Sequence, residues 1–113
     1  MFPGAEVYLL KAMALGAVGC ISASANINAR GIRRLLDSLR QPNAEALQNE
    51  LNDVRKAVES RVLIPAVKAV LAARYRDPAW LNVRPPLMPL GEAERAGLLA
   101  EPAIVRLLEP VRA

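Results

Sequence analysis

The sequence predicts an α/β chain that is mostly α-helical and contains one short buried strand. Hydrophobic residues make up 53% of the chain and aromatic residues only 4%, a composition typical of closely packed helices. From residue 28 onward, apolar residues recur at helical spacing. One apolar run, "VGCISA" at residues 18–23, has the length of a strand that is buried on both faces. A buried helical segment is the alternative for this run, because its periodicity fits both.

The first expected helix covers residues 5–15, which have good helix propensity and contain no glycine or proline. Gly16 ends this helix as a C-terminal cap would. The expected strand at 18–23 follows directly.

The second expected helix starts at Asn28, a candidate N-cap residue. Its apolar face consists of four residues: Ile32, Leu35, Leu36 and Leu39. Gln41-Pro42-Asn43 interrupts the helical pattern, and the next helix is expected at residues 43–60. The apolar positions of that helix are Leu47, Leu51, Val54 and Val58. Its charged residues lie on or beside the opposite face and are expected to be solvated: Glu50, Asp53, Arg55, Lys56 and Glu59.

Pro65 lies near the first turn of a third expected helix, which ends at Arg76-Asp77-Pro78. Four prolines make residues 77–90 irregular, and the expected anchors of this segment are Trp80, Val83 and Leu87. A final helix is expected to start at Gly91.

Composition also excludes several classes of site. The net charge is +4, but the arginines are spread along the chain and no aromatic platform accompanies them, so no nucleic-acid partner is expected. The chain has no histidine and a single cysteine, Cys20, which excludes an intrachain disulfide and predicts no metal site. No apolar run is long enough to cross a membrane. A cytoplasmic location is therefore expected.

The stretch "GAVGCISASANINARG" at residues 16–31 has two further interpretations. A phosphate-binding glycine loop fits poorly, because the glycines at 16 and 19 match neither nucleotide-binding pattern. A secretion signal could be cleaved after Ala23-Ser24-Ala25, and the mature chain would then start at Asn26. However, a secretion signal begins with a basic region, and the first ten residues contain Glu6 and no lysine or arginine, which argues against this interpretation.

The segment "FPGAEVYLLKAMALGAVGCISASANIN" at 2–28 resembles the dihydrodipicolinate synthase / N-acetylneuraminate lyase family. It is similar to that family's seventh-strand end, seventh helix and eighth strand. The segments "LIPAVKAVLAARY" at 63–75 and "VRPPLMPLGEAER" at 83–95 resemble the C-terminal helices and linker. The blocks occur in the family's order and cover about residues 2–100. The resemblance implies a (β/α)8 TIM barrel.

A TIM barrel needs about 250 residues, so this chain is expected to be a C-terminal fragment of one. The resemblance assigns residues 1–41 to the last βα units, namely the end of strand 7, helix 7, strand 8 and helix 8. Residues 42–113 become the family's C-terminal helical extension. It also implies three substrate-binding residues: Ile21, through its main-chain carbonyl, Gly4 and Ser22.

Members of this family are class I aldolases, in which a lysine amine forms a Schiff base with pyruvate or another 2-oxo acid. The resemblance places that lysine on a strand outside this chain, so no catalytic residue is assigned and the chain alone is expected to be inactive. No cofactor is implied, and the expected partner is a second copy or the missing barrel half. The alternatives are a non-catalytic helical association module and a decayed gene product.

Overall fold

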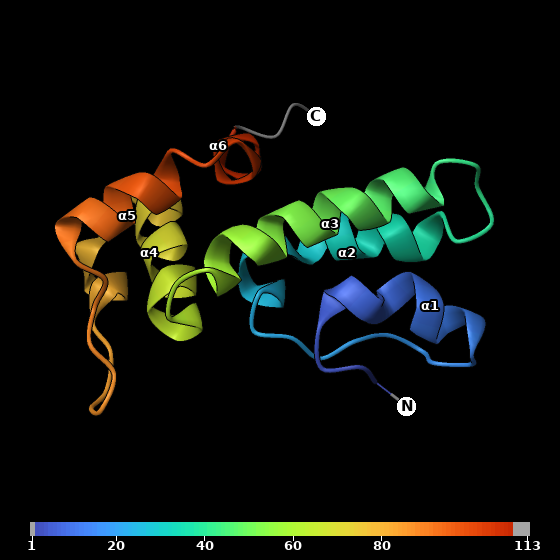
Figure 1. Cartoon of the computed structure of the whole chain (residues 1–113), viewed down its shortest axis with the longest axis horizontal. Helices are drawn as coiled ribbons and strands as arrows, with labels where there is room; N and C mark the ends of the chain where they lie inside the picture. Colours follow the sequence, from blue (N-terminus) through green and yellow to red (C-terminus); the bar gives the residue numbers. More distant parts are fainter. Residues whose placement is uncertain (1, 110–113) are drawn as a thin grey trace. The chain divides into compact units, whose positions relative to one another are not determined.

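The computed structural model describes residues 2–109, which belong to two compact units, Met1–Lys56 and Ala57–Ala113 (Figure 1). Each unit is described by itself below. The helical elements in chain order are η1 (Glu6–Tyr8), α1 (Leu9–Ala14), α2 (Ala25–Asp37), α3 (Ala44–Glu59), α4 (Leu63–Tyr75), η2 (Pro78–Leu81), α5 (Glu92–Leu99) and α6 (Pro102–Leu108). The mostly helical character predicted from the sequence is confirmed.

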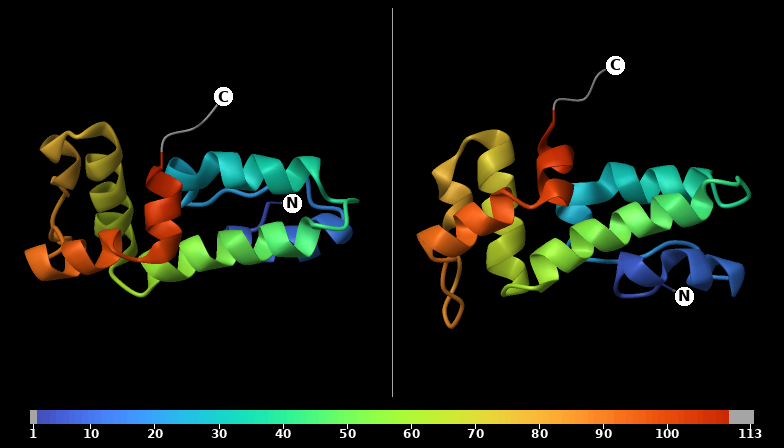
Figure 2. Two further views of the ribbon diagram at one scale, coloured as in Figure 1. Left: turned by 90° about the horizontal axis from the view of Figure 1, so that it is seen from above. Right: turned by 45° about the horizontal axis from the view of Figure 1, so that its top comes forward.

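The first unit is built from α1, α2 and the part of α3 up to residue 56. Its apolar core consists of Leu9, Ile32, Leu35, Ala44, Leu47 and Leu51. Helices α2 and α3 lie side by side (Figure 2), and Gly31 is a point of close approach between them. A Cβ atom at Gly31 would lie 2.9 Å from Cδ2 of Leu51 and 2.5 Å from Oδ1 of Asn28. Glycine therefore allows the two helices to pack at this distance.

Helix α2 begins at Ala25, three residues before the expected N-cap, Asn28. Asn28 lies inside the helix with non-helical angles (φ −135°, ψ 33°), so it marks a kink. Its side chain is buried beside Gly31. The residue expected to start the helix is thus the point at which two helical pieces join.

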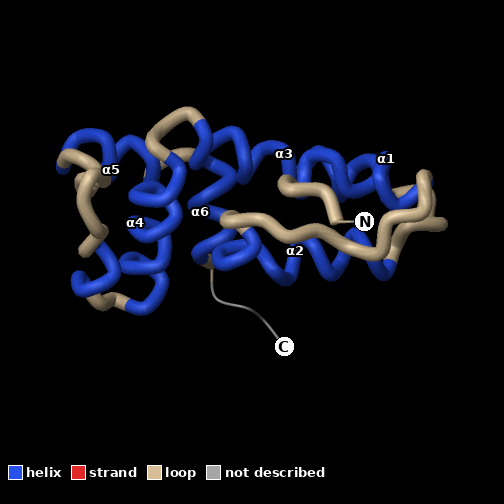
Figure 3. The backbone as a smooth tube through the Cα atoms, turned by 90° about the horizontal axis from the view of Figure 1, so that it is seen from below, coloured by secondary structure: helices blue, strands red, loops and turns tan. Residues whose placement is uncertain are grey.

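The short strand expected at 18–23 is not formed, which corrects the prediction. Residues 17–22 run as a loop, and residues 2–109 contain no strand (Figure 3). The burial expected for both faces of this strand is absent as well, because Val18 is 66% and Ile21 is 71% exposed. A strand needs a neighbour for its N–H and C=O groups. Here the described residues 2–4 supply one acceptor, the carbonyl oxygen of Pro3, which lies 3.1 Å from the Ile21 nitrogen.

Gly16 ends α1 as the sequence predicts. It has a φ of 99°, in the left-handed region that favours glycine. The N–H of Gly16 donates to the carbonyl of Met13 at 3.2 Å, and that of Ala17 donates to Ala12 at 3.0 Å. This reversal returns the chain along α1 and brings residues 17–22 back toward residues 2–4.

The second unit is centred on α4, which packs against η2, α5 and α6. The ring of Trp80 in η2 stacks on that of Tyr75, with centroids 5.8 Å apart. Trp80 remains 40% exposed, whereas Val83 and Leu87 are half-buried. The proline-rich segment is irregular apart from η2, as expected. Pro102 starts an additional helix, α6, that the sequence pattern did not predict.

Candidate functional site

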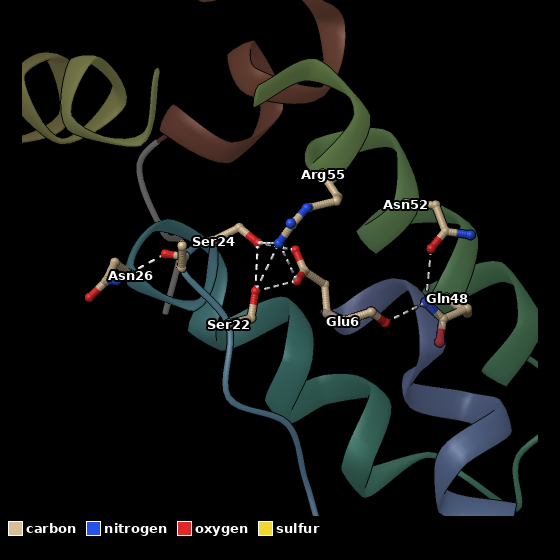
Figure 4. Close-up of polar contacts among 8 residues, drawn as sticks. Glu6, Ser22, Ser24, Asn26, Gln48, Asn52 and Arg55 are labelled. Atoms are coloured by element: carbon tan, nitrogen blue, oxygen red, sulfur yellow. Dashed lines mark hydrogen bonds and ion pairs between the residues drawn. The ribbon is translucent and has the colours of Figure 1, made fainter. Parts of the chain in front are cut away.

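A buried carboxylate, that of Glu6, is the centre of the main polar cluster in the first unit (Figure 4). The hydroxyl of Ser22 donates to Oε2 of Glu6 at 2.6 Å. The hydroxyl of Ser24 donates to Oε1, and the two serine oxygens lie 3.0 Å apart. Each carboxylate oxygen therefore has its own hydroxyl donor, which replaces part of the hydration lost on burial.

Arg55 of α3 supplies the positive charge that a buried carboxylate requires. Its Nη1 atom lies 3.6 Å from Oε2 of Glu6, and their side chains are 10% and 0% exposed. The same nitrogen donates to the hydroxyls of Ser22 at 3.2 Å and Ser24 at 3.3 Å. A guanidinium can serve several acceptors from one position. Arg55 thus holds the Glu6 carboxylate both directly and through the two serines.

Gln48, also on α3, binds the backbone of the same N-terminal segment (Figure 4). Its Nε2 donates to the carbonyl of Glu6 at 2.9 Å, and its Oε1 accepts from the Leu10 N–H at 2.9 Å. Nε2 also donates to Oδ1 of Asn52 at 2.9 Å. Both the main chain and the side chain of Glu6 are therefore fixed by α3.

Ser24 occupies the N-cap position of α2 but makes no side-chain capping hydrogen bond. A serine at this position normally accepts from the second or third N–H of the helix. Here its hydroxyl is engaged by Glu6 and Arg55 instead. The first turn of α2 therefore lacks a side-chain cap, because the Ser24 hydroxyl binds within the buried cluster.

The structure brings together the three residues that the sequence predicts to bind substrate. The Ile21 N–H donates to the carbonyl of Pro3, next to Gly4. Ile21 and Gly4 are both exposed, and nothing lies within 4 Å of a Cβ built at Gly4. Ser22 differs, because its side chain binds Glu6 within the cluster rather than lying on the exposed face. The substrate-binding role of all three remains a prediction.

Cys20 is half-buried beside this site. Burial raises the pKa of its thiol above the ordinary value of 9.0, and the negative charge of Glu6 raises it further. A thiol held neutral in this way is a poor nucleophile at neutral pH. Cys20 therefore packs as a small apolar residue.

Two other kinds of site receive no support from residues 2–109. No group of three or more cysteine, aspartate or glutamate side chains lies close enough to hold a metal ion in this part of the chain. None of its helices is long and apolar enough to cross a membrane.

The expectation that Arg55 is solvated is wrong, because it is 8% exposed. Arg55 lies beside the apolar residues of α3. Their spacing alone does not show whether a neighbouring side chain points into solvent or into the protein. One signal was present: Gln48, Asn52 and Arg55 are spaced by four and three residues, so they form a polar row beside the apolar one. That row meets the buried acid, Glu6.

A family model described as the dihydrodipicolinate synthetase family matches residues 1–101. The match includes the N-terminal segment, the polar cluster and most of the second unit. The chain belongs to the dihydrodipicolinate synthetase family. This confirms the resemblance drawn from the segments at 2–28, 63–75 and 83–95.

Membership in the dihydrodipicolinate synthetase family supports a lyase function of the aldolase type. The mostly helical fold of residues 2–109 is compatible with a part of such a protein. Three members of the polar cluster, Glu6, Ser22 and Ser24, lie in the segment at 2–28 that carried the resemblance, whereas Arg55 lies outside all three segments.

Proposed function

We propose that this chain forms the C-terminal part of a lyase that acts on pyruvate or another 2-oxo acid. In that reaction a lysine amine adds to the ketone carbon of the substrate, water leaves, and a C=N bond forms. The protonated imine accepts the electron pair of a carbon–carbon bond that breaks, and the corresponding enamine donates the pair when the bond forms. We assign the lysine to a part of the enzyme outside residues 1–113, so the chain alone carries no catalytic residue.

One observation supports this proposal: Ile21 is hydrogen-bonded to the residue before Gly4, and both Ile21 and Gly4 are exposed. The Ile21 nitrogen is 3.1 Å from the Pro3 carbonyl oxygen, and Ile21 itself is 71% exposed. The resemblance assigns the Ile21 main-chain carbonyl to the face of the substrate adduct. Open space at Gly4 would let a ligand approach the backbone closely.

We further propose that residues 1–41 are the last βα units of a (β/α)8 barrel and that residues 42–113 are its helical extension. The loop at 17–22 would become a strand once a neighbouring strand supplies donors and acceptors along its free edge. The exposed apolar side chains of Val18 and Ile21 would then be covered. The inward-facing side chains of such barrels are small or branched apolar residues.

The proposal is tested by borohydride trapping with pyruvate, followed by intact-mass and peptide analysis. The chain alone should give no pyruvate adduct, because none of its three lysines (Lys11, Lys56 and Lys68) is assigned the reaction. An adduct on any of them would contradict the assignment. The upstream coding sequence is the second test: an in-frame strand with a lysine supports the proposal, and unrelated sequence there removes its basis.

A second candidate function is a non-catalytic association module, cytoplasmic and free of cofactor. The observation that favours it is a set of exposed apolar residues in the first unit: Phe2, Tyr8, Leu15, Val18 and Ile21. Burial of such residues drives most protein association. Sedimentation or light scattering tests the module: a stable homo-oligomer of the chain favours it, and a monomer argues against it.

A further inference from the structure

We propose that Arg55 is a positioning residue for the two segments that carry the candidate substrate-binding residues. One segment contains Gly4 and leads into Glu6, and the other contains Ile21 and Ser22. The proposal rests on the proposed function for the roles of Ile21 and Gly4. It adds a residue on a different element, α3, to which neither the motifs nor the family match assigns a role.

The contacts of Arg55 join these two segments from one atom. Nη1 faces Oε2 of Glu6 at 3.6 Å and donates to the hydroxyls of Ser22 at 3.2 Å and Ser24 at 3.3 Å. Ser22 is covalently next to Ile21, and Glu6 lies two residues after Gly4. The guanidinium therefore contacts the first segment through the ion pair with Glu6 and the second through hydrogen bonds to the two serine hydroxyls.

Outside the polar cluster, in which Ser22 and Ser24 donate directly to Glu6, few contacts between described residues join the two segments. Among the described residues, one backbone hydrogen bond joins them, from the Ile21 N–H to the Pro3 carbonyl at 3.1 Å. The Ile21 side chain adds little packing between them, since Ile21 and Gly4 are both exposed. The relative position of the two segments therefore depends on the cluster beneath them, in which Glu6 and Ser24 are fully buried.

Burial makes this cluster sensitive to a single change. A carboxylate and a guanidinium that are both withdrawn from water attract each other more strongly than an exposed pair does. Removing the guanidinium leaves the Glu6 charge without its counterion and deprives both serine hydroxyls of a donor. The local backbone is expected to open before the apolar core does, because that core is held together by apolar residues that are not members of the polar cluster.

Amide hydrogen exchange of the 113-residue chain tests the proposal, with the Ile21 N–H as the probe and the Leu35 N–H in α2 as the core reference. Arg55→Met should speed exchange at Ile21 by about tenfold or more relative to the change at Leu35. Arg55→Lys, which keeps the charge but has a single donor group, should give a smaller increase. The matched control is Arg33→Met, an exposed arginine paired with Asp37 at 2.8 Å, which should leave Ile21 unchanged.

Two results would overturn the proposal. The first is an Ile21 exchange rate in Arg55→Met equal to that of the wild type. The second is an increase matched at Leu35 in both Arg55 variants, which assigns the residue to global stability alone. If Arg55→Met does not fold, Arg55→Lys decides by the same comparison. The experiment uses no substrate, so its failure leaves the proposed lyase function untouched, and a failure to bind pyruvate leaves the positioning role untouched.

Discussion

The guanidinium of Arg55 lies 3.6 Å from the carboxylate of Glu6, and the sequence separates the two residues by most of the first unit. Two serine hydroxyls complete the shell around the carboxylate. This buried pair connects α3 to the segment that precedes α1 and to the loop that follows it. The first unit thus contains a buried polar cluster in addition to its apolar core.

Replacing Glu6 by glutamine should destabilise the chain by about 3–5 kcal/mol, because it leaves Arg55 charged and buried without its partner. The measurement is urea unfolding followed by circular dichroism. The control is Asp37→Asn, which breaks the exposed pair with Arg33 (side chains 57% and 73% exposed) and should cost no more than about 1 kcal/mol. Adding Arg55→Met to Glu6→Gln should recover part of the loss. Equal costs for Glu6→Gln and Asp37→Asn would contradict a buried pair.

Replacing Gly31 by alanine should also destabilise the chain, by about 1–3 kcal/mol, because the new methyl group would overlap the Leu51 side chain at 2.9 Å. Thermal unfolding gives the comparison. The control is Gly97→Ala in α5, where the nearest atom is the end of the Arg61 side chain at 3.4 Å. Alanine there should raise stability by up to about 1 kcal/mol through its better helix propensity. The two variants should therefore shift the melting temperature in opposite directions.

Replacing Gly16 by alanine should lower stability by about 1 kcal/mol, since its φ of 99° is unfavourable for a residue with a Cβ. No neighbouring atom lies within 4 Å of the added methyl, so the cost is conformational rather than steric. Gly4→Ala is the matched control, because the space there is equally open and its φ lies outside the left-handed region. A loss in Gly4→Ala as large as that in Gly16→Ala would contradict the explanation.

Alkylation of Cys20 by iodoacetamide should show a pH midpoint above 9.0 in the folded chain, because burial and then the charge of Glu6 raise the pKa of the thiol. In strong denaturant the midpoint should return to about the ordinary value for cysteine. Glu6→Gln should lower the folded midpoint by removing the second cause. A folded midpoint at or below that of the denatured chain would contradict this prediction.

The same pKa shift fixes the sign of a stability change. Well below the unshifted pKa of 9.0 the thiol is neutral in both the folded and the unfolded chain, so the free energy of unfolding does not change with its ionisation. As the pH rises above 9.0, the unfolded chain ionises first, so the free energy of unfolding decreases until the folded thiol also ionises. Cys20→Ala should lack this part of the decrease, which urea unfolding at pH 8 and at higher pH measures.

The helices with a clear apolar face were predictable. Leu47, Leu51, Val54 and Val58 in α3 are all buried, as their spacing indicates. The end of α1 at Gly16 was also predictable, because few residues other than glycine adopt its backbone angles. In both cases the determining interactions are local, so nearby residues contain the necessary information.

The loop at 17–22 and the side chain of Arg55 were not predictable in the same way. An apolar run forms a strand only where another segment pairs with it, and the described residues 2–4 provide a single hydrogen bond. The position of Arg55 beside the apolar stripe fits solvent or burial equally well until Glu6 is placed opposite it. Of the candidate site residues, Ile21 and Gly4 were found through the family motifs, whereas Arg55 and Gln48 required the fold.

The sequence by itself determined the family, the mostly helical character, the main apolar faces and the cap at Gly16, because each depends on neighbours in the chain or on a motif of consecutive residues. Only the tertiary structure decided that Glu6, Ser22, Ser24 and Arg55 meet. The physical reason is that a buried charge is tolerated only where distant segments bring its counterion and donors to one point. Spacing along the chain does not encode that meeting point.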